Sequence, residues 1–387
     1  MSRIDDLIAE LAPDGVEFKP VGEVTARSSN IKWINAGDDQ FQYIDLSSVD
    51  RVTRRIGETP TITAGNAPSR AQQIVHTGDV IFATTRPAQM RWAVIPAEYD
   101  RQIASTGYCV LRPDTSVVLT NFLAHLLGAD AFHQYIEANQ VAGNYPSIPD
   151  NRVRAYRIPV PPLEVQREIV RILDQFTQLE AELEAELEAR RRQYEHYRDQ
   201  LLTFREAGGV RWIPMGDVVD IRTGTKPSEV SDVGDFPYIN AGNEPSGFTA
   251  LANSRGNMIT IPSRGQGGAG HVGYQEVDFW CGPLCYRIDS KSEELSTRFL
   301  YFYLRNVQDH LVALRKVGSI PAVNKSDLGK FLVPVIALEE QQRVVEILDK
   351  FDALVNDLST GLPAELAARR KQYAYYRDRL LTFKEAV

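Results

Sequence analysis

The sequence contains little cysteine, since only Cys109, Cys281 and Cys285 occur in 387 residues. Three thiols are too few for a disulfide framework, and the Cys-x3-Cys pair has no second pair to complete a metal cluster. We therefore predict no metal site and reduced thiols, as in a cytoplasmic protein. The sequence also lacks an apolar run long enough to cross a membrane. Its first residues form a short acidic amphipathic pattern, which we interpret as a helix and not as a signal peptide.

Catalytic motifs are missing as well. The sequence has no Gly-x4-Gly-Lys-Ser/Thr loop, no Asn/Asp-Pro-Pro-Tyr/Phe motif of an amino-methyltransferase, no Gly-x-Ser-x-Gly elbow and no His-Glu-x-x-His helix. The stretch Gly265–Gly270 has the spacing of a dinucleotide-binding loop, but the residues 271–277 after it have the pattern of a strand, not of a helix. We interpret it as a hairpin or a DNA-facing loop. The chain is predicted to have no catalytic residue and no cofactor of its own.

The net charge of −8 is not spread evenly along the chain. Residues 15–158 contain 14 Lys/Arg and 14 Asp/Glu, and residues 208–333 contain 13 of each. The acidic excess lies in the first 14 residues and in the segments 159–207 and 334–387. The neutral balance of the two central regions allows a basic face on each, so charge alone does not exclude nucleic acid.

A long internal repeat organises the chain. Ile169–Phe176 is matched by Val344–Phe351, and Tyr197–Phe204 is matched by Tyr376–Phe383. Two helical segments, 159–207 and 334–387, therefore alternate with two globular regions. We call these regions the first lobe (residues 1–158, including the N-terminal helix) and the second lobe (residues 208–333).

The two lobes share their edges but differ in the middle. Both contain a Ser-Ile-Pro element, at residues 147–149 and 319–321, and both end in Ile-Pro-Val or Val-Pro-Val. Short β-branched and aromatic runs between Gly, Pro, Asn and Asp predict strands, and one or two helices follow them in each lobe. We predict an α+β fold for each lobe, with a curved sheet and helices to one side.

The helical segments have apolar residues at spacings of three and four, which predicts two long helices packed as an antiparallel coiled coil. About 44 residues of helix span roughly 65 Å, too long for packing on one lobe. Pro363 is expected to kink or interrupt the second helix. Packing of each helix against a partner protein is the alternative. The predicted coiled-coil core consists of Ile169, Ile172, Phe176, Leu179, Leu183, Tyr194, Tyr197, Leu201 and Phe204 in the first segment, and of Val344, Ile347, Phe351, Leu354, Leu358, Tyr373, Tyr376, Leu380 and Phe383 in the second.

Two divergent lobes that alternate with two similar helices resemble the specificity subunit of a type I restriction-modification system. The resemblance covers the whole chain, and its most specific parts are Pro162-Leu163-Glu164 with Gln166, Leu338–Gln342, the two Arg-Arg-(Arg/Lys)-Gln-Tyr stretches and the two Tyr-Arg-Asp-x-Leu-Leu-Thr-Phe ends. It implies that each lobe is a target-recognition domain for one half of a bipartite, asymmetric double-stranded DNA target. It also implies that the coil sets the spacer between the halves. The fold is then expected to have an internal pseudo-twofold repeat.

The resemblance implies partners too. Two methylation subunits are expected to dock on the coil and lobe edges, and two ATP-dependent restriction subunits to complete the complex. S-adenosylmethionine, ATP and Mg²⁺ are then expected in those partners and not in this chain. A coiled-coil scaffold whose lobes bind proteins instead of DNA is the alternative, and salt-dependent DNA affinity distinguishes the two.

Base and phosphate contacts require Arg, Lys, Asn, Gln, Ser or Thr on loops. The candidates are Arg51, Arg54, Arg55, Arg70, Arg86 and Arg91 in the first lobe, with Gln72, Gln73 and Gln89 beside them, and Lys226, Asn243, Arg255, Arg264 and Gln266 in the second lobe. Trp33 and Trp280 are interpreted as core residues in preference to base-stacking ones. The basic runs 190–192 and 369–371 either face DNA across the spacer or balance the acids of the coil.

Overall fold

The protein is described from a computed structural model of the chain. The structure describes residues 3–204, 210–242, 244–265, 268–316, 321–357 and 359–386. Three predicted site residues, Asn243, Gln266 and Leu358, lie outside the described residues. The chain divides into two compact units, Met1–Ala185 with Glu365–Val387, and Glu186–Ala364. Each unit contains one lobe together with parts of the long helices.

The first lobe consists of short strands with helices at its edge. Its elements are α1 (Arg3–Leu11), β1 (Phe18–Pro20), β2 (Thr25–Ala26), β3 (Ser29–Asn30), β4 (Phe41–Ile44), β5 (Thr61–Ile62), β6 (Ala71–Ile74), β7 (Val80–Ala83), β8 (Trp92–Val94), β9 (Ile103–Ser105), β10 (Tyr108–Pro113), α2 (Thr120–Gly128), α3 (Asp130–Asn139), α4 (Asp150–Ala155) and β11 (Arg157–Pro159). The apolar run of β7 is buried at every position, as expected for a central strand. Buried Asp79, just before β7, accepts two hydrogen bonds of 2.8 Å from Arg112 of β10 and so joins the two strands.

The second lobe has a similar series of elements. They are β12 (Arg211–Pro214), α6 (Met215–Val218), β13 (Val219–Thr223), β14 (Phe236–Ile239), β15 (Phe248–Thr249), β16 (Met258–Pro262), β17 (Gly273–Gln275), β18 (Trp280–Cys281), β19 (Cys285–Ser290), α7 (Thr297–Asn306), α8 (Gln308–Ala313), α9 (Lys325–Lys330) and β20 (Leu332–Val335). β17 confirms that a strand follows the Gly-rich stretch. It pairs antiparallel with β16, so Gly265 and Gly268–Gly270 lie between the two strands of a hairpin.

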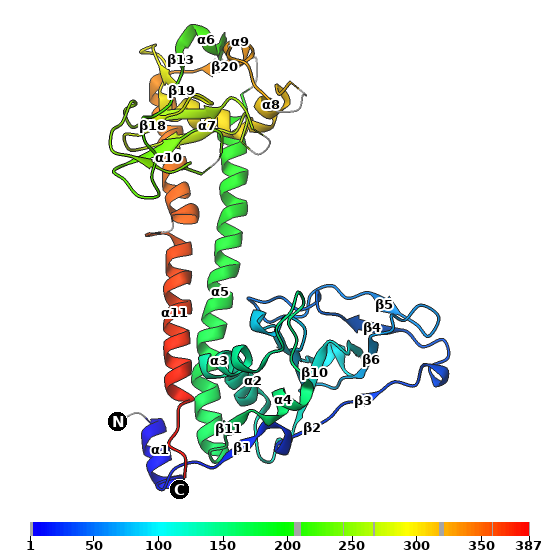
Figure 1. Ribbon diagram of the computed structural model, residues 1–387. Helices are drawn as coiled ribbons and strands as arrows, with labels where there is room; N and C mark the ends of the chain where they lie inside the picture. The colour runs from blue at the N-terminus through cyan, green and yellow to red at the C-terminus, as the bar shows by residue number, and fades with distance from the viewer. Residues whose placement is uncertain are drawn as a thin grey trace. The chain divides into compact units, whose positions relative to one another are not determined.

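The two lobes have the same topology. The four-stranded sheet has the order β2-β10-β7-β8 in the first lobe and β13-β19-β16-β17 in the second. β4 pairs antiparallel with β5 and parallel with β9, and β14 pairs in the same way with β15 and β18. In Figure 1 α2 and α7 occupy corresponding places beside the long helices. The α+β fold class with an internal repeat is confirmed; β3 and β6 extend the first lobe beyond the common plan.

The repeated Ser-Ile-Pro element aligns the two lobes incorrectly. Ser147 forms bridges with Val141 and Thr85, and the residue with the corresponding bridges in the second lobe is Ala322, which pairs with Lys316 and Arg264. The first Ser-Ile-Pro therefore corresponds to residues 322–324, and Pro321 corresponds to Pro146. Ser319 and Ile320 lie outside the described residues. The strand bridges fix the alignment, and the second Ser-Ile-Pro lies three positions before the residues that correspond to the first.

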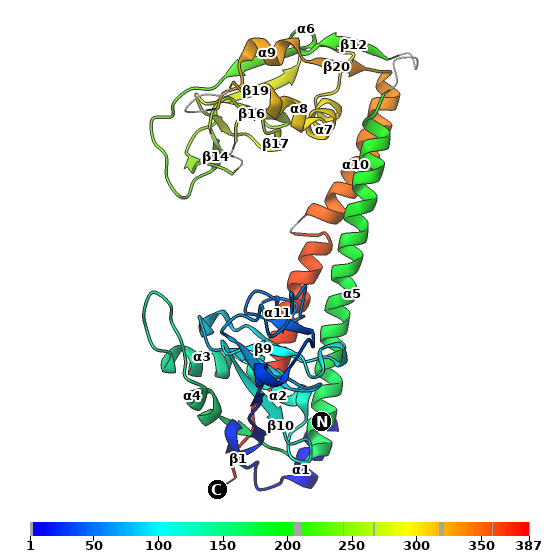
Figure 2. The ribbon, with the colours of Figure 1, turned by 90° about the vertical axis from the view of Figure 1, so that its right-hand side faces the viewer.

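The first long helix is uninterrupted, and the second is divided. α5 (Leu163–Leu202) contains neither Gly nor Pro and follows two prolines, which suit the start of a helix. α10 (Leu338–Asn356) ends before α11 (Leu362–Leu380), so the predicted interruption is confirmed (Figure 2). Gly361 permits the break, because a Cβ there would lie 2.5 Å from the carbonyl oxygen of Ala353. Pro363 lies in the first turn of α11, where no amide hydrogen is needed.

The long helices pair antiparallel within each unit. In the first unit Phe176 of α5 stacks on Tyr376 of α11, with ring centroids 5.6 Å apart, and also contacts Tyr373. In the second unit Phe351 of α10 contacts Tyr194 and Tyr197 of α5 at 6.2 Å and 5.7 Å. The same aromatic contact therefore occurs twice, with the two repeats exchanging roles. Along the described residues, no helix is both long and apolar enough to cross a membrane.

The buried face of the helices differs in part from the predicted stripe. Four predicted core residues are exposed, namely Leu179 (48%), Tyr197 (40%), Leu354 (37%) and Tyr376 (37%). Residues outside the prediction are buried instead: Val165, Leu173, Leu202, Leu348, Val355 and Leu381. Of the predicted set, Ile169, Tyr194 and Val344 are buried, and Ile172, Phe176, Leu183, Leu201, Phe204, Ile347, Phe351, Tyr373, Leu380 and Phe383 are half-buried.

The packing of the lobes explains why the buried face of the helices differs from the predicted stripe. Leu173 and Leu381 belong to the core of the first lobe, and Leu202 and Leu348 belong to the core of the second. The helix ends therefore bury one face against α2 or α7 and another against the partner helix. A prediction based on helix–helix packing alone counts only the second of these faces.

Candidate nucleic-acid interface

A tight turn after Asp50 carries the first group of candidate arginines. The Asp50 carboxylate accepts hydrogen bonds from the amides of Val52 and Thr53 at 2.8 Å and 2.7 Å. The bonds from the Thr53 and Val52 amides lower the pKa of Asp50, because they stabilise the carboxylate. The turn leaves Arg51 and Arg55 exposed. Together with Arg91 they line a hollow of about 560 Å³.

A second hollow, of about 570 Å³, adjoins the first through Arg91. Its lining includes Arg70, Arg86 and Arg91, together with Gln89 and Tyr145. The structure thus brings five of the six predicted arginines of this lobe into two neighbouring hollows. Within the described part of the chain, none of these five guanidinium groups has a carboxylate at ion-pair distance. Unpaired guanidinium groups side by side are the donors that phosphate oxygens and guanine edges require.

Tyr145 is a site residue that the sequence prediction missed. Its side chain is 72% exposed, and the Arg86 guanidinium lies 5.2 Å from the centre of its ring. A large aromatic residue in a loop with Gly143, Asn144 and Pro146 is the signal that would have identified it. Trp33 and Trp280, in contrast, donate indole hydrogen bonds to the carbonyl oxygens of Ala71 and Thr225 within their own lobes.

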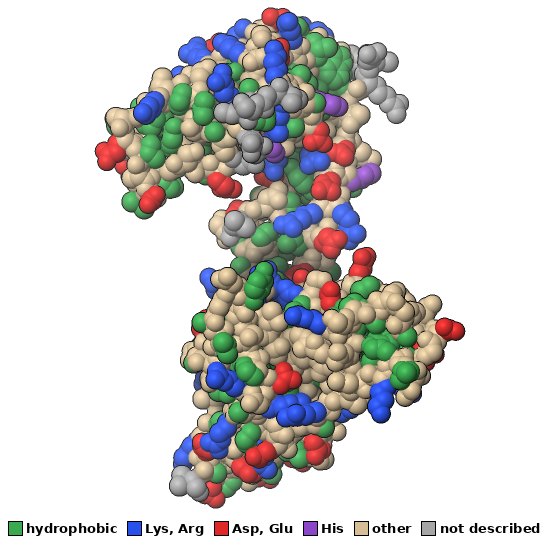
Figure 3. Space-filling model, turned by 45° about the vertical axis from the view of Figure 1, so that its right-hand side comes forward, with side chains coloured by type: hydrophobic (Ala, Val, Ile, Leu, Met, Phe, Trp, Pro, Cys, Tyr) green, Lys and Arg blue, Asp and Glu red, His purple; other side chains and the backbone are tan. Residues whose placement is uncertain are grey.

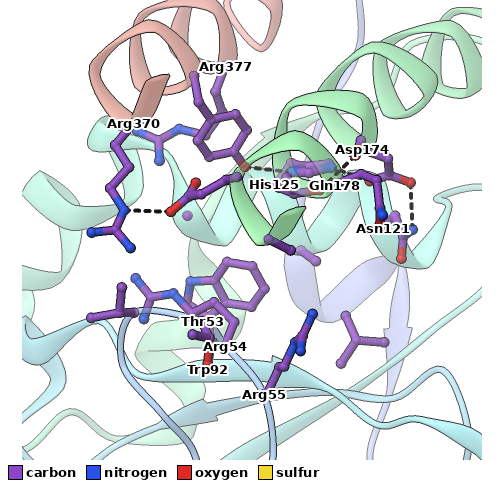
Figure 4. A pocket seen from close by; sticks show the side chains of 18 of the residues that line it. Thr53, Arg54, Arg55, Trp92, Asn121, His125, Asp174, Gln178, Arg370 and Arg377 are labelled. Carbon is purple, nitrogen blue, oxygen red and sulfur yellow. Dashed lines mark hydrogen bonds and ion pairs between the residues drawn. The ribbon is translucent and has the colours of Figure 1, made fainter. Parts of the chain in front are cut away.

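Arg54 is not part of the exposed arginine group. Its guanidinium donates a hydrogen bond to the carbonyl oxygen of Met90 and lies 5.2 Å from the centre of the Trp92 ring. Figure 4 shows Arg54 lying against Trp92, with Arg55 nearby on the same turn. Burial lowers the pKa of Arg54. Arg54 therefore links the Asp50 turn to the turn between β7 and β8, and its contact with DNA stays a prediction.

A cavity of about 620 Å³ lies between this turn, α2, α5 and α11. His125 of α2, 5% exposed, bonds through Nε2 to Asp174 (2.9 Å) and through Nδ1 to the Tyr373 hydroxyl (3.0 Å). Burial raises the pKa of Asp174, but hydrogen bonds from His125 and Asn121 outweigh this and lower it overall. Arg370 bonds to Glu180 at 2.6 Å and also to Glu184. The cavity joins lobe to helices, and it shares the unpaired Arg51 and Arg55 with the hollow of about 560 Å³.

The described candidates of the second lobe lie on three different loops. Lys226 follows β13, Arg255 precedes β16 and Arg264 follows β16, and all three are exposed. Arg255 forms an ion pair of 2.5 Å with Asp289. Lys226 and Arg264 have no carboxylate at ion-pair distance among the described residues, so they are the better candidates.

Basic and acidic side chains are interspersed over the faces seen in Figure 3. This matches the equal counts of both signs in each lobe. The face seen there has no single broad basic surface. In the described ranges, no group of three or more His, Cys, Asp or Glu side chains is arranged to hold a metal ion. Cys109, Cys281 and Cys285 are all buried and free.

Comparison with known proteins accounts for the repeated architecture. The family model of the type I restriction modification DNA specificity domain matches the chain twice, at residues 13–189 and 210–368. The chain belongs to this family. It is 30% identical to the specificity subunit of the type I restriction enzyme EcoR124I/EcoR124II from Escherichia coli, over 99% of this chain and 97% of that protein.

Further relatives agree with this membership. A putative type I restriction enzyme specificity subunit from Haemophilus influenzae is 26% identical, with 95% of this chain and 96% of that protein covered. A structure described as the basis of complex assembly and conformational transition of the type I R-M system matches with a TM-score of 0.64 and 26% identity, over 95% and 97% of the two chains. The HsdS subunit from Thermoanaerobacter tengcongensis matches with a TM-score of 0.52 at 26% identity, over 96% and 97% of the two chains. Type I specificity domains thus occur twice in this chain, once in each lobe.

The basic runs of the helices bond to neighbouring acids. Arg190 and Arg192 lie near Glu186 and Glu188, at 3.4 Å and 3.8 Å. Arg369 lies 3.4 Å from Glu365, one helical turn away. Among the predicted alternatives, balancing of nearby acids therefore describes most of these residues. Arg191 is the exposed member of the first run for which no acid lies at ion-pair distance within the described residues.

Proposed function

We propose that this chain is the DNA-specificity subunit of a type I restriction-modification complex, with each lobe recognising one half of a bipartite, asymmetric target. The observation that carries the proposal is the repetition of one topology with different exposed cations. In the first lobe the unpaired candidate arginines gather in two hollows, and in the second lobe the unpaired candidates Lys226 and Arg264 lie on separate loops. One scaffold with two different surfaces is what recognition of two different half-sequences requires.

The long helices are proposed to set the spacer between the half-sequences. α5 is one continuous helix of 40 residues, which rises roughly 60 Å. Two half-sites read from one side of a duplex lie about 34 Å apart, or a multiple of it. A continuous helix of this length is stiff enough to fix such a distance. The antiparallel contacts of Phe176 and Phe351 restrain its position in each unit.

The chain is proposed to have no catalytic role and to act in the cytoplasm within a larger assembly. Two methylation subunits are expected to dock on the helices and lobe edges, and two ATP-dependent restriction subunits to complete the complex. S-adenosylmethionine, ATP and Mg²⁺ are expected to bind in those subunits. The lack of catalytic motifs in the sequence supports this division of labour.

The decisive experiment is methylation mapping in a host that expresses this chain with a candidate methylation subunit. The expected result is one split motif, with two short specified halves, a fixed gap and dependence on this chain. A complex that assembles but adds no methylation would favour the alternative, a scaffold whose lobes bind proteins. The lobes should then add no salt-dependent affinity for duplex DNA to the complex, since they release no counterions.

The spacer proposal has its own test. Insertion of four residues near Ala185 of α5, together with four near Ala367 of α11, adds about one turn to each helix. Four residues rise ~6 Å, and ~34 Å corresponds to about 10 base pairs. The spacer is therefore expected to lengthen by about one or two base pairs, with both half-sequences unchanged. An altered half-sequence with an unchanged spacer would refute the role of the helices.

A further inference from the structure

Two turns with unrelated sequences occupy the same place in the two lobes. In the first lobe the turn joins β7 and β8, whose last residue pair before the turn is Phe82 with Trp92. In the second lobe it joins β16 and β17, whose last pair is Thr260 with Gly273. Each turn bridges to a second loop, through Thr85 and Ser147 in the first lobe and through Arg264 and Ala322 in the second. The next amide in each turn donates to a proline carbonyl: Arg86 to Pro146 (2.7 Å) and Gly265 to Pro321 (3.2 Å). Residue 86 therefore corresponds to residue 265.

The first-lobe turn holds two side chains in a backbone conformation that favours glycine. Arg86 and Met90 both have φ of 49°, whereas the turn of the second lobe has Gly265 and Gly270 at φ of 125° and 79°. Left-handed conformations of residues other than glycine persist where the surroundings impose them, often at functional sites. Here buried Pro87, the Arg86–Pro146 hydrogen bond and the bond from Arg54 to Met90 impose it. The strained backbone places a guanidinium where the second lobe has no side chain.

The exposed side chains of this turn suit base recognition. Arg86 and Gln89 are both exposed and line the hollow of about 570 Å³. The Arg86 guanidinium rests on Tyr145 and has no carboxylate partner within the described residues. Arginine pairs in a bidentate manner with guanine O6 and N7, and glutamine with adenine N6 and N7. Arg70 and Arg91 line the same hollow and supply cations for the phosphates that flank such bases.

We propose that Arg86 and Gln89 determine the half of the target that the first lobe recognises, with Tyr145 positioning the Arg86 guanidinium. The proposal rests on the proposed DNA-specificity function and assigns that function to particular side chains. Arg264 is the corresponding specificity residue of the second lobe, one position earlier on the equivalent turn. The two lobes thus use the same turn with their arginines in different registers.

Arg101 provides a matched control for Arg86. Both are exposed arginines of the first lobe with positive φ, 59° for Arg101 and 49° for Arg86, but Arg101 lines neither hollow. Glycine accepts this backbone conformation at either position, so Arg86→Gly and Arg101→Gly each remove a guanidinium without adding strain. Arg86→Gly also reproduces the residue that the second lobe has at this point.

The test is methylation mapping with the full complex of this chain and its methylation subunit. Arg86→Gly and Gln89→Ala are each expected to relax a base in one and the same half-site, with a loss of discrimination of roughly 5- to 150-fold at that base. The other half-site and the spacer should not change, and the complex that carries Arg101→Gly should methylate the wild-type motif. Arg264→Ala should relax the opposite half-site only.

Other outcomes separate the failures. If Arg86→Gly and Gln89→Ala leave both half-sites intact, the assignment of these residues is wrong while the proposed function stands. Arg86→Gly could instead weaken binding equally on all sequences and lower the slope of log affinity against log salt concentration by about one. Arg86 then contacts a phosphate, and the assignment is also wrong. If the wild-type complex yields no split motif, it is the proposed function that fails. Gln89→Ala keeps the test decisive if Arg86→Gly does not fold, because Gln89 is exposed.

Discussion

The two lobes of this protein share their framework but differ in the polar contacts built on it. In each lobe a fully buried glutamine of the long helix, Gln166 or Gln341, attaches that helix to the lobe. Further along, Asp174 bonds to His125 and Asn121, whereas the equivalent Asp349 holds the guanidinium of Arg298 at 2.7 Å. This difference indicates that the topology depends on a few buried polar residues, here Gln166 and Gln341, which we call the anchors. The contacts beyond these anchors are free to diverge, and so are the exposed turns.

The glutamine anchors should give the largest effect and the same effect in both lobes. Gln166 bonds to Leu119, Val117 and Pro161, and Gln341 bonds to Ser296, Glu294 and Ile336, all at 2.7–2.9 Å. Leucine at either site removes three hydrogen bonds to backbone groups that are mostly partly buried, so the expected loss is about 3 kcal/mol of unfolding free energy. Urea unfolding measures the loss, and hydrogen exchange at the start of α2 or α7 assigns it to a lobe.

Gln178→Ala is the control, because the side chain of that exposed glutamine of α5 bonds, among the described residues, to Glu182 alone. A large loss for one anchor and a negligible one for the other would break the equivalence of the two lobes. Similar losses, each confined to its own lobe, would establish the anchors as the shared framework.

Arg54 should give the next effect, and only in the first lobe. Arg54→Met keeps much of the side-chain volume but removes the hydrogen bond to Met90 and the contact with the Trp92 ring. A loss of about 2 kcal/mol is expected, since both interactions are partly buried. Exposed Arg55 on the same turn is the control, and Arg55→Met should change unfolding free energy by less than about 0.5 kcal/mol. Equal effects of the two variants would mean that Arg54 does not hold the turns together.

Arg370 gives a smaller effect that distinguishes the two helical repeats. It bonds to Glu180 and Glu184, whereas its counterpart Arg191 is exposed and has no acid at ion-pair distance among the described residues. Arg370→Gln is expected to cost about 1 kcal/mol at low salt and less at high salt, because the pair is partly exposed. Arg191→Gln should leave thermal unfolding unchanged. If Arg191→Gln weakens DNA binding by the complex and Arg370→Gln does not, only the first basic run faces the spacer.

The sequence was sufficient to predict the repeat, the α+β lobes and the interrupted second helix. These features follow from local periodicity and from residues such as Pro363, which act within a few positions of the chain. The buried face of the helices was predicted less well, because Leu173 and Leu348 pack on lobe residues far away in the sequence. Periodicity reports that a helix has an apolar face, but not which neighbour covers each part of it.

The arginine site shows the same limit. Arg51 and Arg55 were identified by composition, and so was Arg54, but its bond to the carbonyl of Met90 was not foreseen. A backbone acceptor 36 residues away leaves no signal in the local sequence. The correspondence of Arg86 with Gly265 was likewise hidden, since it follows from bridges between loops and not from any shared motif. Shared buried anchors can be recognised in sequence, whereas contacts unique to one lobe require coordinates.

Two equivalent tyrosines provide the smallest and most local test of the comparison. The Tyr373 hydroxyl bonds to His125, but the second lobe has Phe302 at the position of His125, and no hydrogen bond joins the Tyr194 hydroxyl to a described residue. Tyr373→Phe is therefore expected to cost about 1 kcal/mol, and Tyr194→Phe close to nothing.

Burial raises the pKa of each tyrosine to about 12. An unfolded tyrosine ionises near pH 10, so the folded state keeps its proton longer, and stability should fall as the pH rises from about 10 to about 12. Each phenylalanine variant should reduce this alkaline loss by a similar amount, measured by urea unfolding and by absorbance at 295 nm. Equal costs at neutral pH would show that the His125 contact contributes nothing, and the polar difference between the lobes at this point would be without energetic consequence.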